Sequence, residues 1–407
     1  MLLSRKEVLF PTKEQSVILN HMGYAAYKLW NVGNYEKKNH KELGMEKFPN
    51  WYDQKKRLKD NFFYKNLPSQ TAQDVLSQLH EAWNSYFIVK RTGGVINPQP
   101  PRFRHDRMDI TYLKDGIKQT GSMVRLSIPK QLKEYLRTLD MDANYIYLKI
   151  KRFSNIPIKE LQLKFSGKKL IAIAVYERED TPVRTDNSRY LSIDLGIHNT
   201  MTCYDSKGSS FIIRGFMEAT HYYDKKIAYL QSISDRQAMA LGEKYPKKTK
   251  RELSLYRKKK NSLTDFIHKA TRMLTDYCVE NNINTVVIGD IKGIRENKDI
   301  GRNNQQLHGL PYEQIYKKLI YKLSVNGIRL IKQKESYSSQ CSPDSPKVSR
   351  KYSCKKNRQC RGLYVEGSVI YNADSVGAYN ILRLYLQNEQ ASIPNHHGLS
   401  APVQVSV

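Results

Sequence analysis

Apolar residues recur through the first ninety positions at the spacing of amphipathic helices. In residues 17–38 and 71–90 they return every three or four positions, and several of them are aromatic. Residues 6–10 ahead of them are typical of a short strand, and Thr12 with Gln15 has the spacing of a helix capping box. Because Gly and Pro residues then interrupt the pattern, we expect a strand followed by a helical unit that ends before residue 101.

The pattern changes between residues 110 and 179 to short runs in which apolar and polar residues alternate. The clearest runs are residues 146–150, 161–165 and 170–176. Alternation with a period of two is typical of half-buried strands, so this block predicts an antiparallel barrel or sheet. A polar connector, residues 181–188, follows it.

The next apolar run, LSIDLGIHNT at residues 191–200, carries an acid at its centre. Asp194 lies inside an aliphatic strand pattern, which continues through residues 201–204 and a turn into residues 210–213. A buried carboxylate is costly unless it is paired or binds a metal. A strand–turn–strand with an acid on its first strand is typical of the metal site in RNase H-like nucleases. The alternative is an aspartate that accepts hydrogen bonds from its own turn.

Further acids follow other predicted elements. Asp290 ends the strand pattern at 284–290, Glu335 follows the strand pattern at 327–332, and Asp374 lies near the start of a helix. Two-metal phosphodiesterases need several carboxylates around two divalent ions about 3.5–4 Å apart. Carboxylate and water ligands favour Mg²⁺ or Mn²⁺ over zinc. Each acid alone is typical of a structural cap, but together they indicate a metal-dependent phosphodiesterase.

The charge balance narrows the choice of substrate. The 407 residues include 68 Lys and Arg against 39 Asp and Glu, a net charge of +29, which favours a polyanionic partner such as nucleic acid over a surface charged only for solubility. The 28 tyrosines could stack on unpaired bases. No apolar stretch is long enough for a membrane span, and the N-terminus does not have the pattern of a signal peptide. Five cysteines, an odd number, favour a reducing compartment, so we expect a cytoplasmic, nucleoid-associated protein without a membrane partner.

Two basic clusters interrupt a long helical pattern at residues 222–281. Such clusters are often only solvated faces, but beside a candidate nuclease strand we expect them to contact phosphates. The expected nucleic-acid-binding residues are Lys247, Lys248, Lys250, Arg251, Arg257, Lys258, Lys259 and Lys260.

Several blocks of the sequence resemble a known family. LSIDLGIHNT, VVIGDIKGIRENKD, NNQQLHGLPYEQIYKKLIYKLSVNGI, ESYSSQ and NADSVGAYNIL are similar to conserved blocks of TnpB proteins. These are transposon-encoded RNA-guided nucleases that resemble the ancestors of type V CRISPR effectors. The resemblance covers most of the chain and implies a multidomain fold that mixes α/β and β parts. Its expected parts are a wedge β-barrel (residues 1–15 and 109–182), a helical recognition insert (16–108), an RNase H-like RuvC nuclease domain (183–385) and a flexible tail (386–407).

The resemblance also implies the catalytic acids. Asp194 matches the first RuvC aspartate and Asp374 the last. Many members have Glu-Asp where this chain has Gly289 and Asp290, but one branch resembles this sequence in having its glutamate in an E-x-Y-[ST]-S-Q block, where Glu335 stands here. We therefore expect Asp194, Glu335 and Asp374 to be the catalytic metal ligands, the alternative set being Asp194, Asp290 and Asp374.

The zinc finger of the family is altered in this chain. Members carry two C-x2-C pairs, whereas Cys341, Cys354 and Cys360 form no such pair. A three-cysteine site completed by Asp344 is an alternative, because zinc accepts oxygen ligands. We expect residues 341–366 to be a degenerate, metal-free finger that contacts nucleic acid, so zinc is unlikely. The contacting residues would be Lys351, Lys355 and Lys356.

The family resemblance implies an RNA-guided DNA endonuclease. A guide RNA from the transposon end would pair with double-stranded target DNA that carries a short adjacent motif. The RuvC site would then hydrolyse phosphodiester bonds with two Mg²⁺ or Mn²⁺ ions. The alternative is a nuclease-inactive, RNA-guided DNA-binding protein that acts like a repressor. A transposase acting without RNA is disfavoured, because no Tyr or Ser recombinase constellation accompanies the acids.

Overall fold

The computed structural model describes residues 1–406 apart from 94, 155, 167–168, 244–245, 292–308 and 361. It divides into two compact units, Met1–Glu179 and Asp180–Val407. Parts of the VVIGDIKGIRENKD and NNQQLHG blocks, including residues 292–295 after Asp290, lie outside the described residues.

The first unit contains two antiparallel sheets and a set of helices. Four strands lie in the order β1-β7-β6-β2 and three in the order β3-β4-β5. The strands are β1 (Leu2–Leu9), β2 (Ile110–Leu113), β3 (Ile117–Thr120), β4 (Met123–Ser127), β5 (Tyr145–Lys149), β6 (Ile158–Ser166) and β7 (Lys169–Glu177). The helices are α1 (Lys13–Lys38), α2 (Trp51–Arg57), α3 (Phe62–Lys65), α4 (Ser69–Thr92) and α5 (Lys130–Arg137), with 3₁₀ turns at Leu58–Asp60, Lys114–Gly116 and Lys151–Phe153.

The helical insert falls between β1 and β2, as the apolar spacing predicted. Thr12 caps α1: its side chain accepts a hydrogen bond from the Gln15 amide at 3.2 Å, and the Gln15 side chain accepts one from the Thr12 amide at 2.9 Å. The apolar faces of α1 and α4 share one core with the strands. Among the aromatic residues of these helices, Trp30 and Trp83 are buried in this core and Tyr27 and Tyr86 pack against it, whereas Tyr24, Tyr35 and Phe87 are exposed.

The second unit is built on a six-stranded sheet in the order β12-β11-β8-β9-β10-β15. The strands are β8 (Tyr190–Leu195), β9 (Met201–Asp205), β10 (Ser210–Ile213), β11 (Thr285–Asp290), β12 (Arg329–Lys334) and β15 (Val403–Val405). β8, β9 and β10 are antiparallel, whereas β11 runs parallel to β8 and β12 parallel to β11. This is the arrangement expected of an RNase H-like domain, and the predicted mixed α/β, multidomain class is confirmed.

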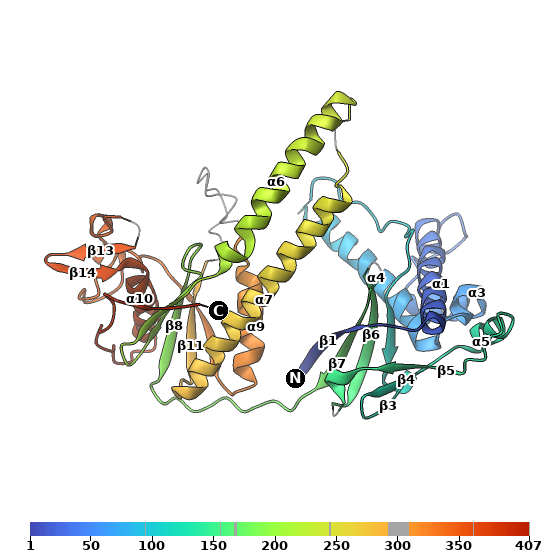
Figure 1. Ribbon diagram of the computed structural model, residues 1–407, viewed down its shortest axis with the longest axis horizontal. Coiled ribbons are helices and arrows are strands. Elements are labelled where there is room, and N and C mark those ends of the chain that lie inside the picture. The colour runs from blue at the N-terminus through green and yellow to red at the C-terminus, as the bar shows by residue number, and fades with distance from the viewer. Residues whose placement is uncertain are drawn as a thin grey trace. The chain divides into compact units, whose positions relative to one another are not determined.

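Helices cover both faces of this sheet (Figure 1). α10 (Ala373–Asn388) packs on one face, and α7 (Lys250–Glu280) and α9 (Tyr312–Ser324) pack on the other. α6 (Phe216–Ala240) runs beside α7 as a helical hairpin, which we call the arm. The segment between β12 and α10 holds β13 (Leu363–Glu366), β14 (Val369–Asn372) and 3₁₀ turns at Arg350–Tyr352 and Lys355–Asn357.

The end of the chain differs from the flexible tail expected over residues 386–407. Residues 386–388 complete α10, and Val403–Val405 adds β15 to the sheet beside β10. Leu399 is buried, and Tyr204 donates a hydrogen bond to the Asn395 carbonyl at 2.9 Å. The prediction of a tail was wrong here because a strand of three residues pairs with a distant partner and leaves little local pattern.

No helix within the described ranges is both long and apolar enough to cross a membrane.

Candidate functional site

Three acids lie where parallel strands end at one edge of the sheet. Ile193 of β8 pairs with Ile288 of β11, and Asp194 and Gly289 directly follow this pair. Asp290 pairs with Lys334 at the end of β12, and Glu335 comes next in the chain. Because neighbouring strands lie about 4.8 Å apart, these side chains start from adjacent positions.

The alternation of side chains places Asp194 and Asp290 on opposite faces of the sheet. Ile193 and Ile288 belong to the core shared with α7 and α9, whereas Ser192 donates a hydrogen bond to the Ala378 carbonyl of α10 at 2.7 Å. Successive residues of a strand point to opposite faces. Asp194 therefore faces α10, and Asp290 faces the α7 and α9 side.

The carboxylate of Glu335 occupies the space beside Gly289. A Cβ atom at position 289 would lie 2.3 Å from Glu335 Oε2 and 3.1 Å from Ile381 Cδ1 of α10. Contacts this short are not tolerated, so this position requires glycine as long as Glu335 keeps its place. Glu335 thus reaches the α10 face of the sheet, the same face as Asp194.

Helix α10 brings Asp374 to the same place. A Cβ atom at Gly377, one turn along the helix, would lie 2.5 Å from Asp194 Oδ2, so the small residue lets the Asp194 carboxylate approach α10. Asn372 caps the helix, since its side-chain oxygen accepts hydrogen bonds from the amides of Asp374 and Ser375 at 3.1 Å each. This capping role leaves the Asp374 carboxylate available for other contacts.

The proximity of the three acids has an electrostatic consequence. Burial, and then the charges of Glu335 and Asp374, raise the pKa of Asp194 to about 8, while Arg358 acts in the opposite direction. A like charge nearby disfavours the ionised form of a carboxyl group. A positive charge placed among the three carboxylates would therefore be stabilised.

Asp374 has a polar partner on each oxygen. Asn199 Nδ2 donates a hydrogen bond to Asp374 Oδ2 at 2.6 Å, and Arg358 donates to Oδ1 at 3.2 Å. Arg358 comes from the cysteine-bearing segment and forms an ion pair with the acid. Two parts of the chain therefore orient Asp374: the loop between β8 and β9, which carries Asn199, and the cysteine-bearing segment, which carries Arg358.

The loop that follows Glu335 is fixed to α10. Asn380, which is fully buried, donates hydrogen bonds to the carbonyls of Ser338 at 2.7 Å and Cys341 at 2.8 Å. Tyr337 in this loop has a φ of 65°, a strained value for a residue with a Cβ. One helix therefore carries Asp374 and also fixes the loop that carries Glu335.

The donor set suits hard divalent ions. All three side chains offer carboxylate oxygens, which favour Mg²⁺ or Mn²⁺ and not zinc. Within the residues that the structure describes, no three His, Cys, Asp or Glu side chains converge closely enough to form a metal-binding cluster. The Asp374 carboxylate is held by one hydrogen bond on each oxygen, from Asn199 and from Arg358.

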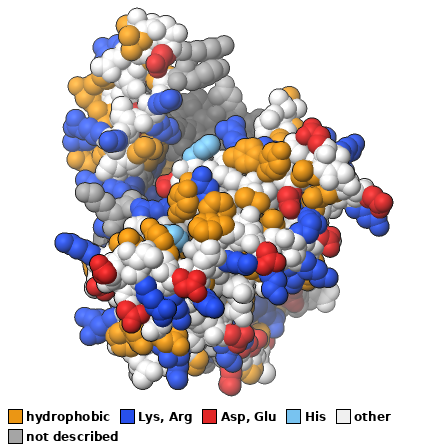
Figure 2. All heavy atoms as spheres, turned by 90° about the vertical axis from the view of Figure 1, so that its right-hand side faces the viewer, with side chains coloured by type: hydrophobic (Ala, Val, Ile, Leu, Met, Phe, Trp, Pro, Cys, Tyr) orange, Lys and Arg blue, Asp and Glu red, His pale blue; other side chains and the backbone are white. Residues whose placement is uncertain are grey.

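The arm carries the predicted basic residues at its far end and along α7. Seven of the eight are exposed: Lys247, Lys248, Lys250, Arg251, Arg257, Lys258 and Lys260. Lys259 is the exception, because its ammonium group forms an ion pair with Asp224 of α6. Lys259 thus joins the two helices of the arm, and its contact with nucleic acid stays a prediction. Lysine and arginine side chains are also exposed over much of the face drawn in Figure 2.

The three cysteines of the degenerate finger do not lie in equivalent environments. Cys341 is buried and its thiol donates to the Ser349 carbonyl at 3.3 Å, whereas Cys354 and Cys360 are exposed. Asp344, the fourth ligand of the alternative zinc site, is 3.3 Å from His396. The exposed Lys351, Lys355 and Lys356 remain candidates for nucleic-acid contact.

Hydrogen bonds from a buried arginine attach the cysteine-bearing segment to α10. Arg383 of α10 is 2% exposed and donates hydrogen bonds to the Ser342 carbonyl at 2.8 Å, to the Ser345 carbonyl and to Asn380 Oδ1 at 2.9 Å. A guanidinium group has five donors in a fixed plane, which suits several backbone acceptors at once.

Protein purified without chelator should contain well under one zinc per chain, as elemental analysis would measure. Cys354→Ser should leave the free energy of unfolding unchanged. Arg383→Leu should lower it by about 1–3 kcal/mol for each carbonyl group left without a donor. Stoichiometric zinc that is lost in Cys341, Cys354 or Cys360 variants would show that the finger still binds metal.

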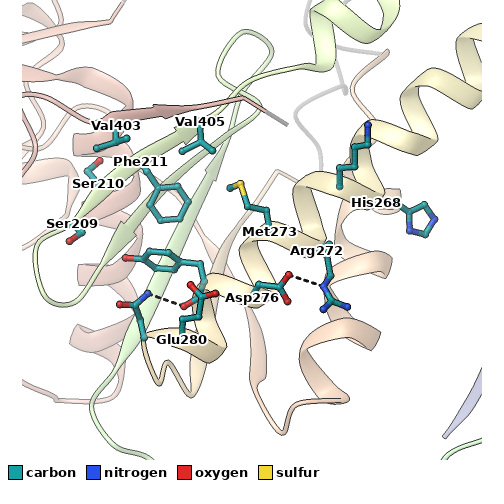
Figure 3. A pocket seen from close by; sticks show the side chains of 13 residues that line it. Ser209, Ser210, Phe211, His268, Arg272, Met273, Asp276, Glu280, Val403 and Val405 are labelled. Carbon is teal, nitrogen blue, oxygen red and sulfur yellow. Dashed lines mark hydrogen bonds and ion pairs between the residues drawn. The ribbon is translucent and has the colours of Figure 1, made fainter.

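A separate hollow of about 930 Å³ lies beside the outer strands β10 and β15, next to α7 (Figure 3). Phe211 of β10, Val403 and Val405 of β15 and Met273 of α7 line it, and Arg272 and Asp276 form an ion pair at its rim. None of the three candidate carboxylates lines this hollow, so it is not part of the acidic site.

Sequence reasoning missed the residues that orient the acids. They are Asn199, Arg358, Asn380 and Arg383. Asn199 lies five residues after Asp194 within the same block, so its position next to the first acid was an available signal. Arg358 carried no such signal, because its contact with Asp374 depends on the path of an irregular segment.

Two family models match this chain, mainly within its second unit. A family model described as a probable transposase, OrfB_IS605, matches residues 173–295, and the Cas12f1-like TNB domain matches residues 312–381. The TnpB-like protein ORF457 of Acidianus two-tailed virus is 22% identical over 408 residues, covering 92% of this chain and 85% of that protein. The fold is similar to that in the Cas12f1–sgRNA–target DNA complex, with a TM-score of 0.63 and 14% identity over 91% of this chain and 83% of that one. With its RNase H-like sheet and its acids at the strand ends, the chain is similar to this TnpB-like protein in sequence and to the Cas12f1 complex in fold.

Proposed function

We propose that this chain is an RNA-guided DNA endonuclease in which Asp194, Glu335 and Asp374 are the catalytic carboxylates. The observation that carries the proposal is the position of the Glu335 carboxylate, which fills the space beside Gly289 on the face that Asp194 shares. The raised pKa of Asp194 supports it, because three crowded acids are suited to holding divalent cations. Asp290 faces the other side of the sheet and has a supporting role.

These carboxylates would hold two Mg²⁺ or Mn²⁺ ions, which when bound supply an activated water and stabilise the leaving 3′ oxygen. The protein's own contribution is positional. Asp194 is fixed by its strand, Glu335 by a loop anchored through Asn380, and Asp374 by its contacts with Asn199 and Arg358. Together they define where a phosphodiester could lie at the edge of the sheet.

The exposed basic residues of the arm support the RNA-guided part of the proposal. They would contact the phosphates of a guide RNA paired to one DNA strand, so base pairing would read the sequence. The guide would come from the transposon end, and the duplex DNA target would carry a short adjacent motif. The similar Cas12f1 structure is a complex with sgRNA and target DNA. We place this activity in the cytoplasm, at the nucleoid.

A guided DNA-binding protein that does not cut is the second candidate. It is favoured by one observation, the ion pair between Arg358 and Asp374, which places a fixed cation beside the third acid. If this pair persisted with divalent ions present, Arg358 would compete with a metal ion for the charge of Asp374. Cleavage assays of the purified complex separate the two candidates.

Purified protein should carry RNA of discrete length, and this RNA should be released as the salt concentration rises. Each phosphate contact releases counterions, so the logarithm of the affinity falls by about 0.7–0.9 per contact for each tenfold rise in salt. Replacing four arm residues by glutamine should therefore reduce this slope by about three. The four are Lys247, Lys248, Lys250 and Arg251. Filter binding of the co-purified RNA across a salt series measures the slope.

A matched control replaces Lys159 and Lys269, exposed lysines that already pair with Glu177 and Asp265. These changes should alter the salt slope little. Preparations at moderate salt that contain no nucleic acid, and that gain no stability from transcripts of the flanking locus, would contradict the guided model.

A further inference from the structure

Asn199 makes two hydrogen bonds that fix the orientation of its amide. It donates through Nδ2 to Asp374 Oδ2 at 2.6 Å and accepts through Oδ1 from Arg214 Nε at 2.8 Å. A carboxylate can only accept and a guanidinium group can only donate, so these partners dictate which end of the amide faces each. Arg214 therefore orients the donor that Asn199 presents to Asp374.

The loop that carries Asn199 is tightly closed. The Gly196 amide donates to the Thr200 carbonyl at 3.4 Å, and a Cβ atom at Gly196 would lie 2.7 Å from the Asn199 carbonyl oxygen. Any side chain at position 196 would push Asn199 away. The glycine that follows Asp194 by two residues thus allows the close turn that brings Asn199 back toward the acids.

The same loop is attached to the base of the arm. The buried Thr200 hydroxyl accepts a hydrogen bond from the amide of Phe216, the first residue of α6, at 3.3 Å. Gly215 before it has a φ of 142°, and a Cβ atom there would lie 2.3 Å from the ring of Phe266 on α7. The position of Arg214 is therefore set by both helices of the arm.

We propose that Asn199, held by Arg214, is a positioning residue that sets the orientation of the Asp374 carboxylate for metal binding. The inference rests on the proposed function and adds to it a residue outside the metal ligands. Asp374 lies between two donors, a neutral amide on Oδ2 and the Arg358 cation on Oδ1. Without the amide, the carboxylate is free to rotate toward Arg358, which competes with a divalent ion for the same charge.

Binding of Mn²⁺ to the nucleic-acid-free protein tests this, because it is read by electron paramagnetic resonance without any cleavage. Asn199→Ala should weaken Mn²⁺ binding by about tenfold, the loss typical of a residue that orients a metal ligand. Arg214→Gln should weaken it less. The double variant should resemble Asn199→Ala alone, because Arg214 acts through Asn199 and the two effects are then not additive.

Asn326→Ala, which removes a side-chain amide that donates to the Lys322 carbonyl at 2.9 Å just beyond the end of α9, should leave Mn²⁺ binding unchanged. Equal Mn²⁺ affinity in Asn199→Ala and wild type would overturn the inference while leaving the nuclease proposal intact. Wild-type protein that binds no Mn²⁺ would overturn both. Wild-type protein that binds Mn²⁺, loses affinity on Asn199→Ala and yet cuts no guide-matched DNA would overturn the nuclease proposal alone.

Discussion

Glu335→Ala should reduce the rate of Mg²⁺-dependent cleavage of guide-matched DNA by at least two to three orders of magnitude, about 3–4 kcal/mol at the transition state. The carboxylate of Glu335 lies beside Gly289 on the face that carries Asp194, so its loss would remove a ligand that no neighbour replaces. Asp290→Ala should reduce the rate far less, because strand alternation turns Asp290 toward α7 and α9. Single-turnover rates at saturating Mg²⁺, with matched DNA binding, measure the difference.

Asp194→Ala and Asp374→Ala are positive controls and should abolish cleavage while binding of matched DNA persists. Gly289→Ala tests the same contact, because the added methyl group would meet Glu335 Oε2 and displace the carboxylate. The assignment is wrong if Asp290→Ala is inactive and Glu335→Ala cuts normally. Wild-type protein that binds matched DNA but never cuts it would favour the guided binder.

The apolar pattern was sufficient to predict most elements of the sheet and the acids at their ends. The runs around Asp194 and Asp290 are aliphatic because both strands are covered by helices on each face, which gives a strong local signal. The family resemblance selected Glu335, and the sheet adds a physical reason for it. Gly289 is small because another residue's carboxylate occupies the space beside it.

The sequence pattern did not predict which side chains from separate elements would contact one another. Lys259 looked like its basic neighbours, but the register of α6 against α7 brings it to Asp224, and neither helix encodes that register locally. Arg358 and Asp374 are only 16 residues apart, yet an irregular segment with few repeating features decides that they meet. Polar residues in loops lack the periodicity that identifies a strand or a helix face.

Asp194→Asn should stabilise the metal-free protein at about pH 8 and remove most of the stabilisation that divalent ions provide. In the folded protein, burial and then the charges of Glu335 and Asp374 raise the pKa of Asp194 to about 8. In the unfolded chain the pKa of an aspartate is about 3.9. The folded state therefore holds a proton that the unfolded state releases, and the free energy of unfolding falls as the pH rises from about 4 to about 8.

Each unit of pKa difference corresponds to at most about 1.4 kcal/mol of stability. Denaturant unfolding in chelator at several pH values measures this slope. Asp265→Asn, which removes an exposed carboxylate paired with Lys269, is the matched control and should keep it. A pH slope that is the same in Asp194→Asn and wild type would mean that Asp194 is already ionised and compensated without metal. In that case the crowding of the three acids could not be what draws divalent ions to the site.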